Sequence, residues 1–224
     1  MSVGRLLTFF GVVFTVSSAI HYYLWARLVR DVQWPAGQGR ALGWLLAGLA
    51  IVLPLSIPLS RFLPRDLASP LYWILFTWLG LMFLLFALLV PADLLRGIAW
   101  VIERLAGGPV DPERRLFLSR VFGGVVGVGA LGLGGWGLFS ALRPIQTRPV
   151  QVPLRDLPDP FAGFVIAQLT DVHVGPTIGR GFIEELVAKT NAMEPDIVAI
   201  TGDLVDGSVE ALGPLVEPLS RLKA

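Results

Sequence analysis

The sequence predicts a multi-span α-helical membrane domain of four transmembrane helices, followed by the opening βαβ unit of an α/β domain. Three observations predict this fold class. Of the 224 residues, 54% are hydrophobic and only 16% are charged, and the mean hydropathy is +0.68, which is too apolar for a soluble protein. Four uncharged segments are long enough to cross a bilayer, which takes roughly 20 helical residues. Two short apolar runs near the C-terminus flank a helical pattern.

The predicted spans cover residues 6–26, 41–60, 67–92 and 121–142, so that residues 1–142 form the membrane domain. The first span is too long in its apolar core for a cleavable signal peptide, and no small-residue cleavage site follows it. His21 lies inside this span, and we interpret it as an interhelical hydrogen-bonding residue rather than a metal ligand. Apolar residues at helical spacing over 93–106, ended by Gly107-Gly108-Pro109, predict a helix along the inner membrane surface.

The arginines predict how the chain crosses the membrane. The loops after spans one and three hold eight arginines, whereas the opposite side, before the tail, holds only Arg5, Arg61 and Arg65. Because positively charged loops stay inside, we expect both the N-terminus and the C-terminal tail on the extracytoplasmic side of the cell membrane. Arg114 and Arg115, before span four, also resemble a twin-arginine export signal; the alternative is that they are ordinary positive anchors.

Charge and cysteine content narrow the chemistry of the tail. Residues 1–150 hold 13 Arg and Lys against 6 Asp and Glu, while residues 151–224 hold 5 against 11. This acidic tail shows no basic face, so we expect no nucleic-acid partner. The chain has no cysteine, which excludes disulfides, a thiolate nucleophile and Cys-ligated zinc. A metal ion must therefore bind to oxygen and imidazole groups.

Residues 143–160 contain five prolines and no long apolar run, which predicts an extended linker to a tail domain at residues 161–224. The tail patterns predict a strand at 164–169, a helix at 179–193, a strand at 197–201 and a further helix after Ser208, bent by Pro214 and Pro218. Both strands are nearly all apolar, as expected of parallel strands that are covered on both faces.

Polar side chains follow each predicted strand. Asp171 and His173 come directly after the first strand, and Asp203 and Asp206 come after the second. The carboxyl ends of parallel strands meet at one edge of a sheet, where ligands bind in open α/β folds. Neighbouring strands lie roughly 4.8 Å apart, and paired metal ions in hydrolytic sites lie roughly 3.5–4 Å apart. The sequence therefore predicts a metal site in which one carboxylate can touch two ions.

These residues also resemble two signature motifs of a known family. The segment Asp171-Val172-His173 resembles the DxH motif of the calcineurin-like metallophosphoesterases. Their GDxxD motif is matched by the similar segment Gly202-Asp203-Leu204-Val205-Asp206, in which Asp203 lies 32 residues after Asp171. The flanking segments QLT at 168–170 and VAIT at 198–201 are typical of its membrane-anchored bacterial branch. The resemblance covers residues 161–224 and does not extend to the membrane domain.

The resemblance implies a four-layered α/β/β/α fold. It also implies hydrolysis of a phosphomonoester or phosphodiester, and lipid-linked or nucleotide-linked phosphoesters are the candidate substrates. It implies two divalent metal ions, with Mn, Fe, Zn or Mg as candidates. Asp171 and His173 would bind the first ion and Asp203 would bridge both. Asp206 would orient a later catalytic histidine; the alternative is that Asp206 is a turn former or helix cap.

The family pattern also requires a GNH(D/E) motif, a further histidine and a GHxH motif, and none of them occurs in residues 1–224. We therefore expect an N-terminal fragment of a membrane-anchored phosphoesterase that is inactive by itself. The alternative is a non-enzymatic membrane scaffold or sensor with a degenerate phosphoesterase-like tail.

Overall fold

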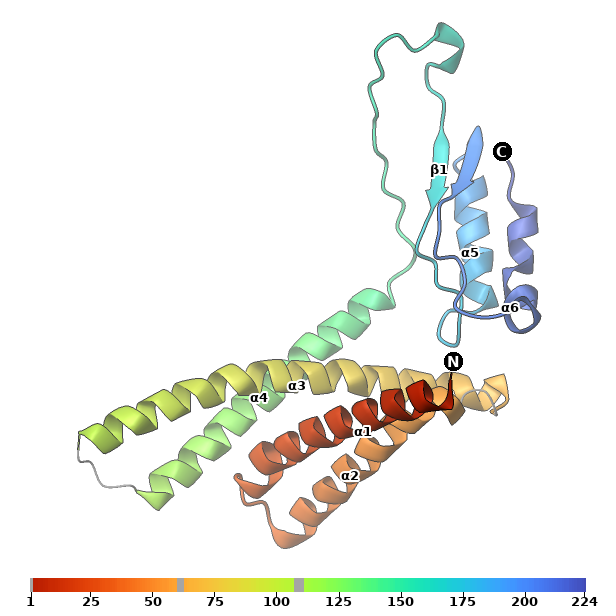
Figure 1. The fold of residues 1–224 in the computed structure, drawn as a ribbon. Helices are drawn as coiled ribbons and strands as arrows, with labels where there is room; N and C mark the ends of the chain where they lie inside the picture. Colours follow the sequence, from red (N-terminus) through yellow and green to blue (C-terminus); the bar gives the residue numbers. More distant parts are fainter. Residues whose placement is uncertain (1, 60–62, 107–110) are drawn as a thin grey trace. The chain divides into compact units, whose positions relative to one another are not determined.

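Figure 1 shows the computed structural model, which describes residues 2–59, 63–106 and 111–224. The chain divides into two compact units, Met1–Leu142 and Arg143–Ala224. The predicted end of span two at Ser60, Arg61 and the predicted helix break Gly107-Gly108-Pro109 lie outside the described residues.

The first unit is helical. Its elements in the described residues are α1 (Val3–Trp25), the π-helical turn η1 (Ala26–Arg30), α2 (Ala36–Leu59), α3 (Arg65–Leu105) and α4 (Pro112–Ala141). The four long helices are apolar enough to cross a membrane, in agreement with the four predicted spans. Pro54 and Pro58 lie inside α2, where neighbouring helices can compensate for the missing backbone donors.

The third helix differs from the prediction, which treated residues 93–106 as a separate surface helix. Span three and this segment form one helix of 41 residues, which runs through Pro91 and Asp93 without a break. Asp93 is neutralised here by arginines, as described below, so its charge does not require the helix to end at the span boundary. Residues 93–105 are therefore helical as predicted, but they do not form a separate helix; their place at the membrane surface stays a prediction.

The core of this unit lies between α1, α3 and α4. The buried side chains are those of Leu24, Met82, Leu85, Leu89, Val126 and Ala130. Glycines of α4 allow close approach to this core: a Cβ on Gly123 would lie 3.2 Å from Val32 Cγ2, and one on Gly134 would lie 3.7 Å from Leu81 Cδ1. Part of the glycine-rich face of α4 therefore packs within the bundle.

Hydrogen bonds of buried polar groups connect three of the helices. His21 Nδ1–H donates to the carbonyl of Ser17 at 2.8 Å, and Trp78 Nε1–H donates to His21 Nε2 at 3.0 Å. Ser17 Oγ donates to the carbonyl of Ala50 at 3.1 Å. Nδ1 of His21 thus bonds within α1, while Nε2 joins α1 with α3, which agrees with its interpretation as an interhelical hydrogen-bonding residue.

A partly buried ionic cluster holds η1 and α1 against α3. Asp93, whose side chain is 17% exposed, accepts a hydrogen bond from Tyr23 Oη at 2.6 Å. Arg27 Nε lies 2.7 Å from Asp93 Oδ2, although its N–H is not aligned for a hydrogen bond. Arg27 Nη1 also pairs with Asp31 at 2.8 Å, and Arg96 approaches Asp93 at 3.6 Å. Desolvated charges are costly unless paired, so this cluster fixes how the helices meet.

The second unit contains the predicted βαβ pattern. Its elements are η2 (Asp159–Phe161), β1 (Ile166–Leu169), α5 (Arg180–Asn191), β2 (Ile197–Ile200), α6 (Val209–Val216) and η3 (Glu217–Arg221). In the described residues, β1 and β2 form a two-stranded parallel sheet in which Ile166 pairs with Ile197 and Leu169 with Ile200. The predicted parallel pairing is confirmed. Ser208 caps α6 by accepting from Ala211 N, and the chain changes to the 3₁₀ turn at Pro218.

One face of the sheet is covered and the other is not. Leu169, Val172 and Val174 pack against Ile183, Leu186 and Val187 of α5 to form the core of this unit. Ile166 and Ile197, by contrast, are 62% and 46% exposed. We expected side chains to cover both faces of the sheet. Within the described residues, the side chains that cover it lie on the face that packs against α5, so this expectation is not met.

The predicted linker is partly attached to the second unit. Ile145 packs against the core of this unit, and Lys189 Nζ donates to its backbone carbonyl. The start of the 143–160 segment is thus held by α5.

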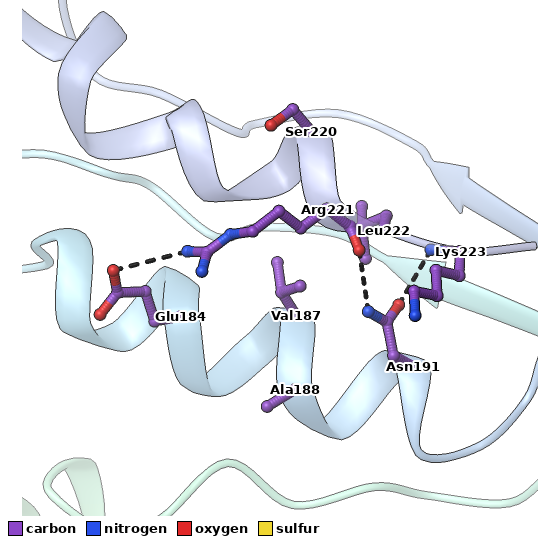
Figure 2. Close-up of a pocket in the computed structure, with 8 residues that line it drawn as sticks. All are labelled: Glu184, Val187, Ala188, Asn191, Ser220, Arg221, Leu222 and Lys223. Atoms are coloured by element: carbon purple, nitrogen blue, oxygen red, sulfur yellow. Dashed lines mark hydrogen bonds and ion pairs between the residues drawn. The ribbon is translucent and has the colours of Figure 1, made fainter.

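The last turn of the chain is tied to α5, as Figure 2 shows. Asn191 Nδ2 donates to the carbonyl of Arg221 at 2.8 Å, and Lys223 N donates to Asn191 Oδ1 at 2.9 Å. Arg221 also lies 3.5 Å from a carboxylate oxygen of Glu184. A cavity of about 510 Å³ lies here, but several of its polar groups are bonded to one another, and we assign it a packing role.

The ionic cluster gives a test of the membrane unit. Asp93→Asn should lower the free energy of unfolding by roughly 1–3 kcal/mol, since it removes one of the two carboxylates that pair with the partly buried Arg27 and leaves only Asp31. The measurement is denaturant unfolding of the full chain in detergent micelles, followed by circular dichroism. Glu103→Gln is the matched control, because its partner Arg114 and Glu103 itself are 64% and 52% exposed, and such pairs contribute under about 1 kcal/mol. Equal losses for both variants would contradict the assignment.

Candidate metal centre

The segment after β1 alternates between buried and exposed side chains. Val172 and Val174 are 7% and 0% exposed and point into the core of the second unit. Asp171 and His173 are exposed on the other side. The buried valines therefore determine which way the two polar side chains point.

The segment after β2 runs alongside it. Asp171 N donates to the carbonyl of Gly202 at 3.3 Å, and His173 N donates to that of Asp203 at 2.9 Å. Further on, Asp206 N donates to the carbonyl of Val174 at 2.9 Å, and a parallel bridge joins Val174 with Val205. Backbone pairing thus continues past the ends of both strands and brings the two polar segments together.

The result is a cluster of three candidate ligands. One ligand atom each from Asp171, His173 and Asp203 lies within 4.8 Å of the others. Two ligands at roughly 2.1 Å from one ion lie at most about 4.2 Å apart, so a small rotation of these exposed side chains would close the cluster around a cation. Two carboxylates and an imidazole suit Mn, Fe, Zn or Mg, so the donor set fits the metals that the sequence predicts.

The backbone of the cluster is in an unusual conformation. Asp171, His173 and Asp203 have φ values of +54°, +50° and +45°, and they are three of the six non-glycine residues with positive φ in the described part of the chain. A left-handed conformation costs a residue with a Cβ roughly 1–2 kcal/mol. Strain of this kind concentrates at functional sites, which favours a functional role for the cluster over a simple pair of turns.

Asp206 lies beside His173. The distance from His173 Nδ1 to Asp206 Oδ1 is 2.9 Å. This hydrogen bond and the negative charge of Asp206 raise the pKa of His173, and the carboxylates of Asp203 and Asp171 add to the effect. With Nδ1–H donated to a carboxylate, Nε2 keeps the lone pair that would face a metal ion, as in carboxylate–histidine–metal arrangements.

The sequence expectation for Asp206 was different. The family resemblance predicts that Asp206 orients a histidine later in the chain, and that role stays a prediction. In this structure, the Asp206 carboxylate is hydrogen-bonded to the His173 ring. The alternative of a helix cap is not what the structure shows, because Ser208 caps α6. The signal that sequence reasoning missed is the pairing of Val174 with Val205, which places Asp206 opposite His173.

Two threonines lie next to the cluster. Thr170 Oγ1 donates to Asp171 Oδ2 at 2.7 Å, and Gln168 Nε2 donates to Thr201 Oγ1 at 2.9 Å. Thr170 therefore orients a carboxylate of the cluster. In the described part of the chain, His173 forms an ion pair with Asp206 and no basic side chain pairs with Asp171 or Asp203, so the cluster carries excess negative charge that a cation would offset.

Comparison with known proteins gives relatives but no structural match. The chain is 38% identical over 88 residues to a zebrafish (Danio rerio) transmembrane protein with metallophosphoesterase domain, covering 39% of the chain and 20% of that protein. It is 35% identical over 127 residues to a bovine (Bos taurus) protein of the same description, covering 57% of the chain and 28% of that protein. A Bacillus subtilis protein named as a metallophosphoesterase is 30% identical over 96 residues, covering 42% of the chain and 34% of that protein.

The bovine match is longer than the whole second unit, so the similarity extends into the membrane helices. These relatives support the family resemblance drawn from the DxH and GDxxD motifs. They include animal as well as bacterial proteins, and so do not single out the bacterial branch. The chain spans about a fifth to a third of the length of these relatives. No family model and no solved structure matches the chain, and the four-layered fold stays an expectation.

The contact between His173 and Asp206 can be tested by titration. Asp206→Asn should lower the pKa of His173 toward its ordinary value of about 6.5, because it removes the largest cause of the increase. The pKa is measured by NMR of the ring protons in the full chain with a chelator present; the chain has two histidines, and His173→Asn assigns the signals. Glu210→Gln, an exposed carboxylate on α6, is the control and should change nothing. An unchanged pKa in Asp206→Asn would refute the contact.

The sign of the linked stability follows from the same increase. Folding raises the pKa of His173, so the folded state holds this proton more tightly than the unfolded chain does. The stabilisation is therefore fully present below the unfolded pKa and is lost as the pH rises through the higher folded pKa.

Proposed function

We propose that this chain carries the first half of a binuclear metal site in a membrane-anchored, calcineurin-like phosphoesterase, which hydrolyses a phosphomonoester or phosphodiester. The observation that carries the proposal is the convergence of Asp171, His173 and Asp203 at the carboxyl ends of β1 and β2, within the DxH and GDxxD motifs. Relatives described as transmembrane proteins with a metallophosphoesterase domain support it.

Each residue has a defined task in this proposal. Asp171 and His173 would hold the first ion, and Asp203 would contribute a carboxylate to both. Divalent cations at such a site supply Lewis acidity toward a phosphoryl oxygen and neutralise the charge of an anionic substrate. Thr170 keeps the Asp171 carboxylate in position, and Asp206 keeps the His173 imidazole in the tautomer that leaves Nε2 for the metal. Without cations, the carboxylates would repel a phosphate group.

The proposal places the site on the extracytoplasmic side of the cell membrane. Four spans return the chain to the side on which it began, so the N-terminus and the second unit lie on the same side. The arginine-rich ends of the helices, which include Arg27 and Arg30 in η1 and Arg96 in α3, would lie on the other side and favour the cytoplasm.

Metal binding tests the proposal directly. The full chain in detergent micelles should bind Mn²⁺ in a calorimetric titration, and Asp203→Asn or His173→Ala should abolish most of this binding. Asp206→Asn should weaken it by roughly 10- to 100-fold, the usual effect of losing a residue that orients a metal ligand. Glu210→Gln should bind as the parent chain does. Absence of Mn²⁺ and Zn²⁺ binding would favour the scaffold or sensor alternative.

The same preparation should not turn over a generic substrate such as p-nitrophenyl phosphate. Residues 1–224 contain neither the GNH(D/E) nor the GHxH motif, so the ligands that complete the second ion in this family are missing from them. Metal-dependent release of p-nitrophenol by the purified chain, lost in Asp203→Asn, would show that the site is more complete than proposed.

A further inference from the structure

A second candidate site lies inside the membrane unit, between α1 and α2. It is a cavity of about 730 Å³, a size within the range of roughly 300–1,000 Å³ that ligand pockets have. The lining residues that matter here are Tyr22, Trp25, Gly43, Trp44, Ala47 and Arg40.

The floor of the cavity is made by small residues of α2. Gly39, Gly43, Ala47 and Ala50 follow one another along the lining of this helix. At Gly43 the opposite wall comes close, since a Cβ there would lie 3.3 Å from Trp25 Nε1. The rim carries large aromatic side chains, of which Tyr22 is 62% and Trp44 is 78% exposed. Because the two helices come this close at Gly43, a long and mostly apolar ligand would lie over this contact, beside the exposed rings of Tyr22 and Trp44, and not between the helices.

The length of the cavity matches one leaflet of a bilayer. Its lining on α2 runs from Ala36 to Ile51, which at 1.5 Å per residue is about 22 Å. Half of a typical hydrocarbon core is about 15 Å, and the remainder corresponds to the head-group region. The cavity thus begins at the end of a predicted span and reaches about the middle of the membrane.

Charge is confined to one end of the cavity. Arg40 lies at the start of α2, where its Nε–H donates to the carbonyl of Ala36 at 3.2 Å, and no carboxylate pairs with it among the described residues. Arg30 stacks 5.9 Å from the ring centre of Trp25, although Asp31 offsets its charge. The described lining contains no Asp or Glu.

The rest of the lining offers little polarity. His21 is buried, and both of its ring nitrogens already bond to Ser17 and Trp78, so it presents only ring carbon to the cavity. The far end, at Ala50 and Ile51, is apolar. A cation at one end and apolar walls beyond it complement a molecule with an anionic head and a hydrocarbon tail.

We propose that this cavity binds one anionic phospholipid from the leaflet on the arginine-rich side, with the phosphate at Arg40 and an acyl chain along Gly43, Ala47 and Ala50. A soluble phosphate would leave the apolar walls uncovered, and a zwitterionic lipid would gain less from Arg40. This inference goes beyond the phosphoesterase function and is independent of the cluster at Asp171, His173 and Asp203.

The test uses photolabelling of the full chain in nanodiscs. The discs contain phosphatidylglycerol and phosphatidylcholine in equal amounts, with a trace of one or the other carrying a diazirine on its acyl chain. One arginine near a membrane surface contributes about a fivefold preference for an anionic lipid. We expect phosphatidylglycerol to label α1 and α2 about fivefold more than phosphatidylcholine does, at residues that line the cavity.

Two pairs of variants separate a specific site from general lipid contact. Arg40→Gln should remove the preference for phosphatidylglycerol, whereas Arg104→Gln, an arginine that stacks on Trp100 away from the cavity, should keep it. Ala47→Phe should fill the cavity and abolish labelling at its lining, whereas Ala41→Phe, on the same helix but outside the lining, should not.

Circular dichroism of each variant verifies that it is folded, and Arg40→Gln, at an exposed position, serves as the second test if Ala47→Phe does not fold. Equal labelling by the two lipids in the parent chain would overturn the proposal. Labelling of the lining that persists in folded Ala47→Phe would also overturn it.

Discussion

The candidate site depends on one interaction, the parallel backbone pairing of β1 with β2 and its continuation beyond both strands. His173 N bonds to the carbonyl of Asp203, and Asp206 N bonds to that of Val174. These bonds keep two connecting segments side by side, while the buried valines Val172 and Val174 turn the intervening side chains outward. Because the backbone is paired, the left-handed conformations at Asp171, His173 and Asp203 can persist despite their cost.

The membrane unit depends on a related constraint, since charges that leave water must be paired. Asp93 lies in the middle of a 41-residue helix and is acceptable there because Tyr23, Arg27 and Arg96 surround it. His21 is likewise satisfied on both nitrogens. Arg40 is the contrasting case, a cation at the end of an apolar cavity without a carboxylate partner in the described part of the chain. The paired polar groups hold the helices together, whereas the unpaired Arg40 is available to bind an anionic ligand.

The two units thus present two different kinds of site. The second unit exposes a cluster of carboxylates that would attract cations, and the first exposes an arginine beside apolar walls that would attract an anionic lipid. The match to the bovine transmembrane relative is longer than the second unit, so part of it lies in the membrane helices.

The sequence by itself determined the four spans, the parallel strand pair and the residues at the strand tips, because hydropathy, strand patterning and a short motif are local properties of the chain. Only the tertiary structure decided the partners of those residues. The contact of Asp206 with His173 depends on the register of two segments 33 residues apart, and the continuous α3 depends on charges contributed by another helix. The lipid cavity likewise depends on how closely α1 and α2 approach. Such features arise from where backbones lie in space, which no local pattern of residues specifies.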